Sequence, residues 1–531
     1  MRRLLSLCLV VLTAIGPVML PAPAFAQSGT ATPIKHLVVI FQENVSFDHY
    51  FATYPVAANP AGEPAFHAKA GTPSVNGLSG GLLTLNPNLN PANGTGASNP
   101  FRLDRSQAAT ADQDHGYTAE QAAFDAGLMD LFPLNTGTSG PPPSSTATNA
   151  LVMGYYDGNT VTALWNYAQH FAMNDNSYDT NFGPSTPGAI NLVSGQTNGV
   201  INTDGQAGFA LVDGGDGTTT LIDDADPLGD VCSASGQVLM GGANVGDLLN
   251  AAGVSWGFFE GGFDLTITNS NGSKGCKRST TSTVTGVTKK DYIPHHQPFQ
   301  YYASTANLNH TRPTSVATIG KQGDAGNHQY DLHDFFDAVK AGNFPAVSFL
   351  KASGFQDGHA GYSDPLDEQA FLVDTINFLE KQKDWKSTAV VILYDDSDGW
   401  YDHQMGPILN QSQSSADALS APGMCGAATP GLAGYLGTGN PDGRCGYGPR
   451  QPFLVVSPFA KHNFVDHTVT DQTSALRFIE DNWLGGQRIA GSFDAVANSI
   501  TPMLDFKRHG EDGDNDRLFL NDQTGEVVAA H

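Results

Sequence analysis

The chain has 531 residues, with 26 Lys and Arg against 52 Asp and Glu, and a formal net charge of −26. This length allows one large α/β domain with insertions, or two to three ordinary domains. The acidic balance argues against nucleic acid or an anionic membrane as a partner held by bulk charge, so any bound phosphate needs a local cationic site.

The N-terminal residues 1–26 have the three parts of a secretory signal peptide. Met1-Arg2-Arg3 is followed by the apolar stretch 4–14 and by the small residues of Ala24-Phe25-Ala26. We expect cleavage after Ala26 and a mature protein in the periplasm or outside the cell. The arginine pair leaves Sec and twin-arginine export open. No other run approaches the roughly 20 apolar residues of a spanning helix, so no integral membrane segment is expected in the mature chain.

Four cysteines remain once Cys8 is removed with the signal peptide. An even number of cysteines in an oxidising compartment indicates disulfides rather than metal thiolates. Of the three possible connectivities, the two pairs that are close in sequence are favoured, Cys232 with Cys276 and Cys425 with Cys445.

The first buried strand is predicted at residues 36–41, and it runs directly into Glu43 and Asn44. These side chains offer two oxygen ligands suited to a divalent cation, although a helix cap or turn is the alternative. Residues 57–110 are rich in Gly, Pro, Asn and Ala and are interpreted as surface loops. His115 precedes a helix predicted at 118–129. It is either a functional residue or a surface or capping residue.

Ser185 is predicted to stand at the N-terminus of a helix. A helix predicted at 161–171 is followed by F-G-P-S-T-P-G-A-I-N-L at 182–192, in which Pro187 suits a first helical turn. Backbone N–H groups at such a terminus favour an anion, so the hydroxyl lies beside a site suited to phosphate. The alternative is that Ser185 or Thr186 only caps the helix.

Residues 200–300 are dominated by Gly, Thr, Asn and Asp, with a helix and a short strand predicted only within 244–259. We interpret this region as an insertion that forms a cap over the site. It ends at His295 and His296, a pair between prolines that suits phosphate contacts or metal ligands, or that lies in an exposed loop without a role.

Regular alternation of helices and strands begins at residue 331. A helix at 331–341, a strand at 346–350, a helix from about 366 and a strand at 389–394 predict a parallel sheet. A second Gly-rich insertion at 404–450 precedes a buried strand at 453–456 and a helix at 471–483.

The strand at 389–394 is apolar throughout and then breaks into Asp395 and Asp396. Ligands bind at the carboxyl ends of strands in open parallel sheets, so this pair indicates a metal or phosphate site, with a simple turn as the alternative. His359 follows the strand at 346–350 and is expected at the same edge of the sheet.

These segments together carry a family resemblance that spans nearly the whole mature chain. The chain resembles the bacterial phosphoesterase family that contains secreted phospholipases C and the respiratory-burst-inhibiting acid phosphatase. The matching motifs are Q-E-N-V-S-F-D-H-Y-F (42–51), D-H-G-Y-T (114–118), G-P-S-T-P-G (183–188), H-H-Q-P-F (295–299), D-G-H (357–359), W-K-S-T-A-V-V-I-L-Y-D-D-S-D-G-W-Y-D-H (385–403) and H-T-V-T-D-Q-T-S-A-L-R-F-I-E-D-N (467–482).

The resemblance implies a single phosphoesterase domain at 27–531, with insertions at about 200–300 and 404–450. Its fold would be alkaline-phosphatase-like α/β, a parallel sheet flanked by helices with the Gly-rich insertions forming a cap over the site. The resemblance also assigns roles by position. Ser185 would be the nucleophile. One divalent metal ion would be surrounded by Glu43, Asn44, Ser185, Asp395 and Asp396. The phosphoryl site would be lined by His115, His295, His296 and His359.

Oxygen ligands favour Ca²⁺, Mg²⁺ or Mn²⁺, while Zn²⁺ stays open. Six further positions match the family, and we interpret them as mainly supporting the site: Asp48, His49, Asp398, Asp402, His403 and Arg450.

Three differences distinguish the branches of the family. Phospholipases of this family commonly have Arg in place of Val45, Thr in place of Ser185, and Asp-Glu in place of Asp395-Asp396. The resemblance therefore predicts a secreted, metal-dependent acid phosphatase that acts on small phosphate monoesters through a phosphoseryl intermediate. The alternatives are a phospholipase C that releases a phosphorylated head group, and a secreted protein that binds metal or phosphate without turnover.

Overall fold

The computed structural model describes residues 29–140, 148–234, 236–426, 431–439, 441–507 and 516–530. The predicted signal peptide and its cleavage site lie outside these residues. Within the described ranges no helix has the length and apolar character needed to cross a membrane.

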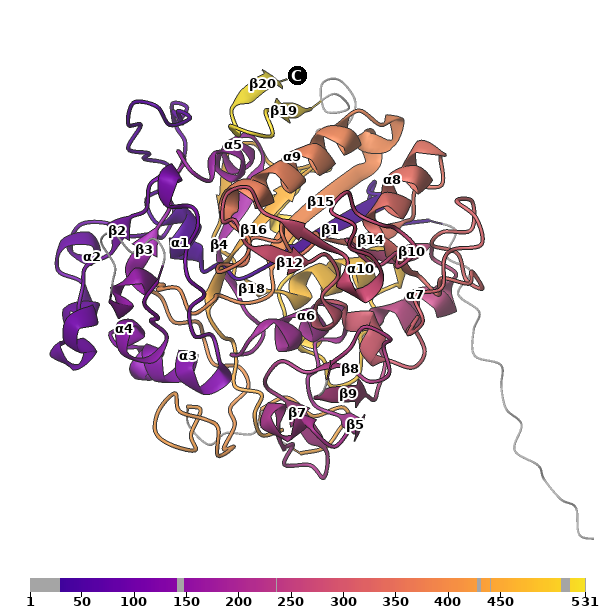
Figure 1. The fold of residues 1–531 in the computed structure, drawn as a ribbon, viewed down its shortest axis with the longest axis horizontal. Helices are drawn as coiled ribbons and strands as arrows, with labels where there is room; N and C mark the ends of the chain where they lie inside the picture. Colours follow the sequence, from indigo (N-terminus) through magenta and orange to yellow (C-terminus); the bar gives the residue numbers. More distant parts are fainter. Residues whose placement is uncertain are drawn as a thin grey trace, which may run out of the picture.

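A large sheet forms the centre of the molecule (Figure 1). In the described ranges its strands, in spatial order, are β13 (Gln329–Asp331), β10 (Trp256–Glu260), β14 (Val347–Lys351), β1 (His36–Gln42), β15 (Thr388–Tyr394), β16 (Arg450–Val456), β4 (Ala172–Tyr178) and β17 (Phe464–Asp466), while β18 (Thr470–Asp471) pairs with β4. β1 is fully buried from Leu37 to Phe41, as expected for a strand covered on both faces.

The sheet is mostly parallel, which confirms the predicted α/β class with one correction. The five strands from β13 to β15 are parallel, but β16 runs antiparallel to both β15 and β4. No helix is present between β15 and β16 in the described part of residues 395–449. A parallel neighbour would need such a crossover, and the chain instead returns through a loop and pairs in the opposite direction.

The predicted helices lie on the two sides of this sheet, with α5, α8 and α9 toward one side of Figure 1 and α6, α7 and α10 toward the other. Their bounds are α5 (Thr162–His170), α6 (Ser185–Ser194), α7 (Val245–Ala252), α8 (Leu332–Lys340), α9 (Pro365–Glu380) and α10 (Thr473–Trp483). The helix predicted at 118–129 is shorter, α3 (Tyr117–Phe124), because Asp125 and Ala126 adopt left-handed backbone angles that end it.

Shorter elements complete the described fold. They are α1 (Phe47–Phe51), α2 (Gly81–Thr84), α4 (Phe132–Asn135), β2 (Phe101–Arg102), β3 (Gly154–Tyr155), β19 (Leu518–Leu520) and β20 (Val527–Ala530). The 200–300 region adds β5 (Val200–Thr203), β6 (Leu211–Asp213), β7 (Thr219–Leu221), β8 (Asp226–Pro227), β9 (Gln237–Met240), β11 (Ser279–Thr281) and β12 (Thr288–Lys290). This region also contributes α7 and β10, the predicted helix and strand, to the main fold.

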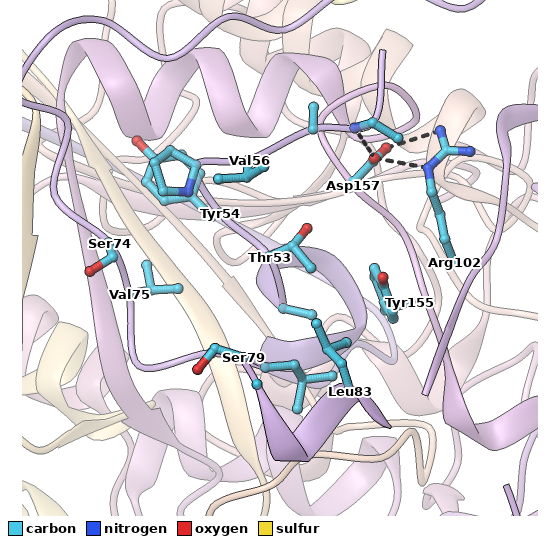
Figure 2. A pocket seen from close by; sticks show the side chains of 17 residues that line it. Thr53, Tyr54, Val56, Ser74, Val75, Ser79, Leu83, Arg102, Tyr155 and Asp157 are labelled. Atoms are coloured by element: carbon cyan, nitrogen blue, oxygen red, sulfur yellow. Dashed lines mark hydrogen bonds and ion pairs between the residues drawn. The ribbon is translucent and has the colours of Figure 1, made fainter. Parts of the chain in front are cut away.

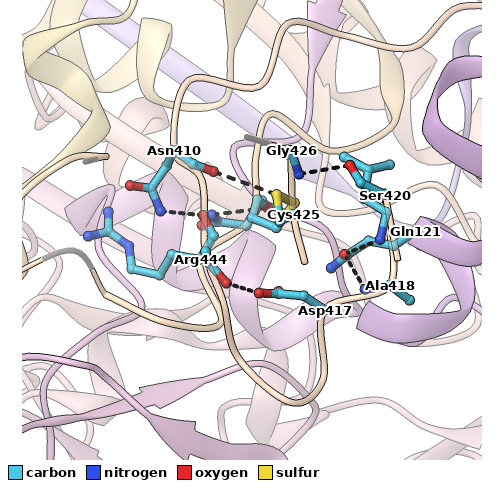
Figure 3. Close-up of a disulfide and its surroundings, with 12 residues drawn as sticks. Gln121, Asn410, Asp417, Ala418, Ser420, Cys425, Gly426 and Arg444 are labelled. Carbon is cyan, nitrogen blue, oxygen red and sulfur yellow. Dashed lines mark hydrogen bonds between the residues drawn. A yellow bond between two sulfur atoms is a disulfide. The ribbon is translucent and has the colours of Figure 1, made fainter. Parts of the chain in front are cut away.

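Both predicted disulfides are present. Cys232 joins Cys276, and Cys425 joins Cys445, with Cα atoms 5.2 and 5.8 Å apart. Figure 3 shows the second disulfide inside the 404–450 loop. The side-chain oxygen of Gln121 on α3 accepts hydrogen bonds from the backbone N–H groups of Ala418 and Leu419 in this loop. The loop is therefore fastened to the helix that follows His115.

Candidate active site

The oxygen ligands predicted from two separate strands meet at one edge of the sheet. Gln42 at the end of β1 pairs with Tyr394 at the end of β15, so the residues that follow leave adjacent strands at the same level. The backbone N–H of Asn44 donates a 2.9 Å hydrogen bond to Asp395 Oδ1. All four predicted side chains are buried, namely Glu43, Asn44, Asp395 and Asp396.

Ser185 is the first residue of α6, as predicted, and its hydroxyl points into the same cluster. Ser185 Oγ lies 3.0 Å from Asp396 Oδ2 and 3.2 Å from Glu43 Oε2. Gly188 makes this approach possible, because an added Cβ there would lie 2.0 Å from the carbonyl oxygen of Asp395. The structure thus brings the five predicted metal ligands together, and we call them the oxygen set.

The oxygen set fits a hard divalent cation. Asn44 Oδ1 and Asp395 Oδ2 are buried without a hydrogen-bond partner in the structure. The amide nitrogen of Asn44 donates to Asp398 Oδ1 at 3.1 Å, which leaves the oxygen available as a ligand. Burial, followed by the charge of Asp395, raises the pKa of both Glu43 and Asp396 well above the usual values. Such crowded buried carboxylates favour a bound cation.

Lys351 belongs to the same cluster, and the sequence analysis missed it. It ends β14, the strand beside β1, and its buried ammonium pairs with Glu43 and lies 4.0 Å from Asp395 Oδ2. Burial opposes its charge, but these two carboxylates raise the pKa of Lys351 above its usual value. The signal was available, because the lysine follows the predicted strand at 346–350 directly at the edge where the acids were expected.

The four predicted histidines gather around the oxygen set. His296 Nδ1 lies 3.2 Å from Glu43 Oε1, and His115 Nε2 lies 3.5 Å from Asn44 Nδ2. The rings of His295 and His296 are 4.6 Å apart, and those of His115 and His359 are 6.0 Å apart. The sequence therefore identified one connected cluster from segments far apart in the chain.

The environments of these histidines differ. Burial opposes the charge of His115, but Asp396 and Asp398 raise its pKa well above the usual value. Burial, followed by the charges of His115 and Lys289, holds the pKa of His359 well below it. Asp112, His115, His359 and Asp398 also bring one ligand-type atom each within 4.8 Å of one another, a grouping that could hold a metal ion. The pKa values of these imidazoles are therefore shifted in opposite directions, which suits acid–base chemistry.

Glu120 is a second residue that the sequence analysis missed. This buried side chain of α3 accepts a 2.9 Å hydrogen bond from the N–H of Gly183 and a 2.6 Å bond from Ser397 Oγ. Burial raises the pKa of Glu120 to about 7. The carboxyl group therefore joins the turn before Ser185 to the loop after Asp396. No sequence pattern distinguished it from other polar residues of the helix.

The matched residues Asp48, Asp402, His403 and Arg450 form a separate ion-pair network. Arg450, at the start of β16, is fully buried, and its Nη2 lies 3.1 Å from both Asp48 Oδ1 and Asp402 Oδ2. His403 Nδ1 is 2.6 Å from Asp48 Oδ2. Because the arginine already binds both acids, the arrangement indicates a structural support rather than ligands of the oxygen set.

A cavity of about 560 Å³ lies beside α1 and the loop that follows it (Figure 2). Its lining is mostly apolar and comes from residues 52–58 and 74–83, with the ion pair of Arg102 and Asp157 at one end. None of the predicted site residues lines it. The cavity is therefore distinct from the cluster described above.

Comparisons with known proteins give several phospholipases C as sequence relatives. The chain is 26% identical over 495 residues to a "Non-hemolytic phospholipase C" of Burkholderia pseudomallei, covering 91% of this chain and 59% of the relative, so it spans little more than half of that protein. It is 24% identical over 500 residues to "Phospholipase C A" of Mycobacterium tuberculosis, covering 90% and 80%.

A solved structure of murine ectonucleotide pyrophosphatase/phosphodiesterase 5 covers 65% of this chain and 94% of its own, at 12% identity and a TM-score of 0.31, which is too low to support a conclusion about the fold. The sequence relatives, together with a family model, support a phosphoric ester hydrolase. That family model matches residues 34–484, most of the chain, and the chain therefore belongs to the Phosphoesterase family.

Proposed function

We propose that the chain is a secreted, metal-dependent acid phosphatase that hydrolyses phosphate monoesters through a phosphoseryl intermediate on Ser185. One observation carries the proposal. The hydroxyl of Ser185 starts a ten-residue helix and lies within 3.2 Å of two buried carboxylates of the oxygen set. A nucleophile needs a neighbouring proton acceptor and a partner for the phosphoryl charge, and this position offers both.

The first step transfers the phosphoryl group to the serine. Ser185 Oγ attacks phosphorus, its proton passes to the carboxylate of Glu43 or Asp396 that accepts its hydrogen bond, and the bond from phosphorus to the leaving oxygen breaks. A divalent ion bound by the oxygen set would favour the alkoxide and neutralise negative charge on the phosphoryl oxygens. Lys351, with its charge next to Glu43, adds positive charge on the same side.

The histidines act on the leaving side. An imidazole N–H of the cluster donates its proton to the leaving oxygen, so that a neutral alcohol departs. Water then attacks phosphorus of the phosphoserine, and the now basic imidazole accepts its proton. The bond from phosphorus to Ser185 Oγ breaks, the carboxyl group that took the serine proton returns it to Oγ, and inorganic phosphate is released. His115, His295, His296 and His359 thus replace the function that a second metal ion performs in two-metal enzymes.

Phospholipase C activity is the second candidate, and the named relatives favour it. The family resemblance favours the phosphatase at Val45, Ser185 and the Asp395-Asp396 pair, because phospholipases of this family commonly have other residues there. A protein that binds metal or phosphate without turnover is the third candidate.

The decisive experiment compares p-nitrophenyl phosphate with phosphatidylcholine as substrates of the purified mature protein and of Ser185→Ala. We expect the protein to release phosphate from the monoester and Ser185→Ala to lose activity by about 10³-fold or more. Unchanged turnover in Ser185→Ala would contradict the mechanism.

Two other results would select the other candidates. Much faster release of phosphocholine than of phosphate supports phospholipase C. Retention of metal, measured by elemental analysis, without hydrolysis of either ester supports a binding protein.

A further inference from the structure

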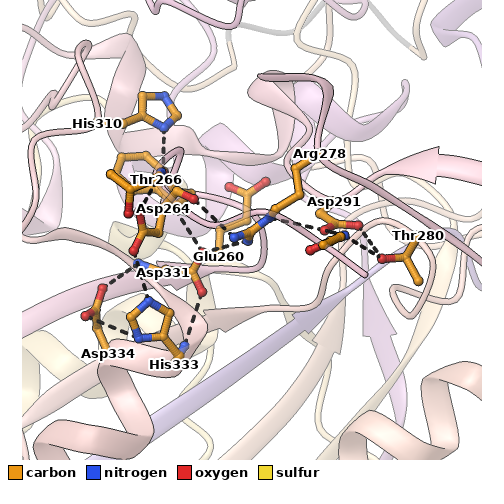
Figure 4. A network of polar contacts seen from close by, with 12 residues as sticks. Glu260, Asp264, Thr266, Arg278, Thr280, Asp291, His310, Asp331, His333 and Asp334 are labelled. Atoms are coloured by element: carbon orange, nitrogen blue, oxygen red, sulfur yellow. Dashed lines mark hydrogen bonds and ion pairs between the residues drawn. The ribbon is translucent and has the colours of Figure 1, made fainter. Parts of the chain in front are cut away.

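The β11–β12 hairpin of the 200–300 region is held firmly at its base. Arg278, just before β11, is buried, and its Nε lies 3.2 Å from Asp291 Oδ2, just after β12. The same guanidinium donates a 2.9 Å bond to Asp331, the residue that caps α8 (Figure 4). Two carboxylates thus close the hairpin and connect it to the main fold.

The hairpin packs on the loop that carries Asp357 and His359. Thr285 Oγ1 donates a 3.2 Å hydrogen bond to the carbonyl oxygen of Tyr362. An added Cβ at Gly354 would lie 3.0 Å from Cγ of Lys289, so the lysine stem passes directly over this loop. The position of the lysine side chain is therefore set by packing on both sides.

The ammonium group of Lys289 lies over an aromatic ring next to the histidine cluster. Its Nζ is 3.5 Å from the ring centroid of Tyr362, whose ring also stacks with that of His359 at 4.2 Å. The hydroxyl of Tyr362 donates to Asp357 Oδ2 at 3.1 Å. In the described part of the chain, Lys289 forms no ion pair with a carboxylate. Burial lowers the pKa of Lys289, and four carboxylates oppose this, those of Asp357, Glu43, Asp112 and Asp224. None of the four lies within ion-pair distance of the ammonium, which therefore keeps its capacity to bind an anion.

The charge of Lys289 reaches three of the four predicted phosphoryl-site histidines. It contributes to the lowered pKa of His359 after burial and His115, and to that of His296 after burial, Lys351 and His295. The pKa of His295 is raised overall: burial lowers it, Asp224 raises it, and the charge of Lys289 has a smaller lowering effect. The geometry agrees with these effects, because the ammonium lies over the ring of Tyr362, which stacks on His359. Lys289 is therefore next to the histidines that the proposed mechanism places beside the leaving group.

We propose that Lys289 determines leaving-group specificity: it favours phosphate monoesters whose leaving group carries a second anionic group close to the ester oxygen, and it disfavours cationic leaving groups such as choline. The inference rests on the proposed phosphatase function and names its substrate class. A fixed cation beside the leaving group attracts a carboxylate or second phosphate and repels a quaternary ammonium.

The test uses three esters that differ in leaving-group charge. Glycerol 3-phosphate and 3-phosphoglycerate differ only at one carbon, which is a hydroxymethyl group in the first and a carboxylate in the second. Phosphocholine is the ester with a cationic leaving group. Phosphate release gives kcat/KM for the wild type, Lys289→Met, Lys289→Glu and Lys290→Met. Lys290 is the matched control, because it is the exposed neighbour on β12 and loses the same charge.

We expect the wild type to prefer 3-phosphoglycerate over glycerol 3-phosphate by about fivefold or more at low salt. Lys289→Met should bring this ratio to about one, Lys289→Glu should reverse it and improve phosphocholine hydrolysis, and Lys290→Met should leave it unchanged. Circular dichroism and metal content confirm that each variant is folded and loaded.

A wild-type ratio of one or less, or a ratio that Lys289→Met leaves intact, would overturn the inference. Failure to release phosphate from all three esters and from p-nitrophenyl phosphate would instead reject the proposed function. In that case calorimetric binding of 3-phosphoglycerate and glycerol 3-phosphate to Ser185→Ala, with and without Lys289→Met, still decides the role of Lys289: equal binding in both proteins contradicts it.

Discussion

The carboxyl group of Glu120 accepts a 2.9 Å hydrogen bond from the backbone N–H of Gly183, two residues before Ser185. Because its other oxygen binds Ser397, the group fixes the nucleophile turn against the acidic loop. We expect Glu120→Ala to lower kcat by roughly 10- to 100-fold with little change in KM, since misplacement affects the reacting hydroxyl more than substrate binding. Glu120→Gln should retain most activity, and steady-state kinetics on p-nitrophenyl phosphate measures both.

The contrary outcome for Glu120 is equally clear. If Glu120→Ala and Glu120→Gln lose the same amount of activity, or if KM rises while kcat is unchanged, the carboxyl group does not act by positioning Ser185. Metal content measured in each variant separates this effect from loss of the metal ion.

The buried network around Arg450 predicts a large effect on stability. Arg450→Met would leave the buried carboxylates of Asp48 and Asp402 without their cation. We expect a loss of about 3–5 kcal/mol in the free energy of unfolding, measured by urea denaturation. Lys321→Met, which removes an exposed charge, should change stability by less than about 1 kcal/mol. Equal effects of the two substitutions would refute a structural role for the network.

The pH dependence of stability follows from buried acids outside the site. Burial raises the pKa of Glu368 to about 8, although Tyr394 and Tyr50 donate hydrogen bonds to it that lower the pKa. The unfolded chain therefore releases a proton that the folded chain retains, and the free energy of unfolding falls as pH rises from about 4.5 to about 8.

Glu380 follows the same rule, because burial raises its pKa to about 8. We expect Glu368→Gln to reduce the decline in stability between pH 5 and 8 by roughly 2–4 kcal/mol. Exposed Glu526→Gln is the control and should leave the slope unchanged. Thermal unfolding across this range measures both, and an unaltered slope in Glu368→Gln would show that the carboxyl group ionises normally.

Removal of the metal ion should affect both stability and activity. Without a metal ion, the buried carboxyl groups of Glu43 and Asp396 both lie close to Asp395, and Lys351 pairs with Glu43 alone of the two. We expect EDTA to abolish hydrolysis and to lower the melting temperature, by the equivalent of about 3 kcal/mol for an ion present at 100 times its Kd. Asn44→Ala should weaken metal retention in elemental analysis. A chelated protein with an unchanged melting temperature would argue against a metal in the oxygen set.

The sequence predicted most of the sheet core and the cluster, because buried strands such as β1 and β15 are apolar throughout and end in acids. It did not predict β4, whose polar side chains hide the strand pattern. In the structure those groups have partners, since Asn174 donates to the carbonyl oxygen of Thr468 and Asp175 lies 2.7 Å from His467. Partners of this kind come from segments that are distant in sequence, which no local pattern reveals.

The same limit explains the missed site residues. Lys351 and Glu120 act through what they contact in three dimensions, and neither belongs to a motif by residue type alone. The antiparallel direction of β16 could not be predicted from the sequence either, because a buried strand has the same composition in either direction.

The reversed direction of β16 leaves the loop between β15 and β16 free to vary in length. Since β16 runs opposite to β15, its first residue, Arg450, lies level with Tyr178 at the end of β4. The long loop between β15 and β16 therefore leaves and re-enters the sheet on the side where Asp395 and Ser185 lie. Residues can be added to or removed from this loop without lengthening any connection across the sheet, so the loop can vary in length while the strands that carry the cluster stay in register.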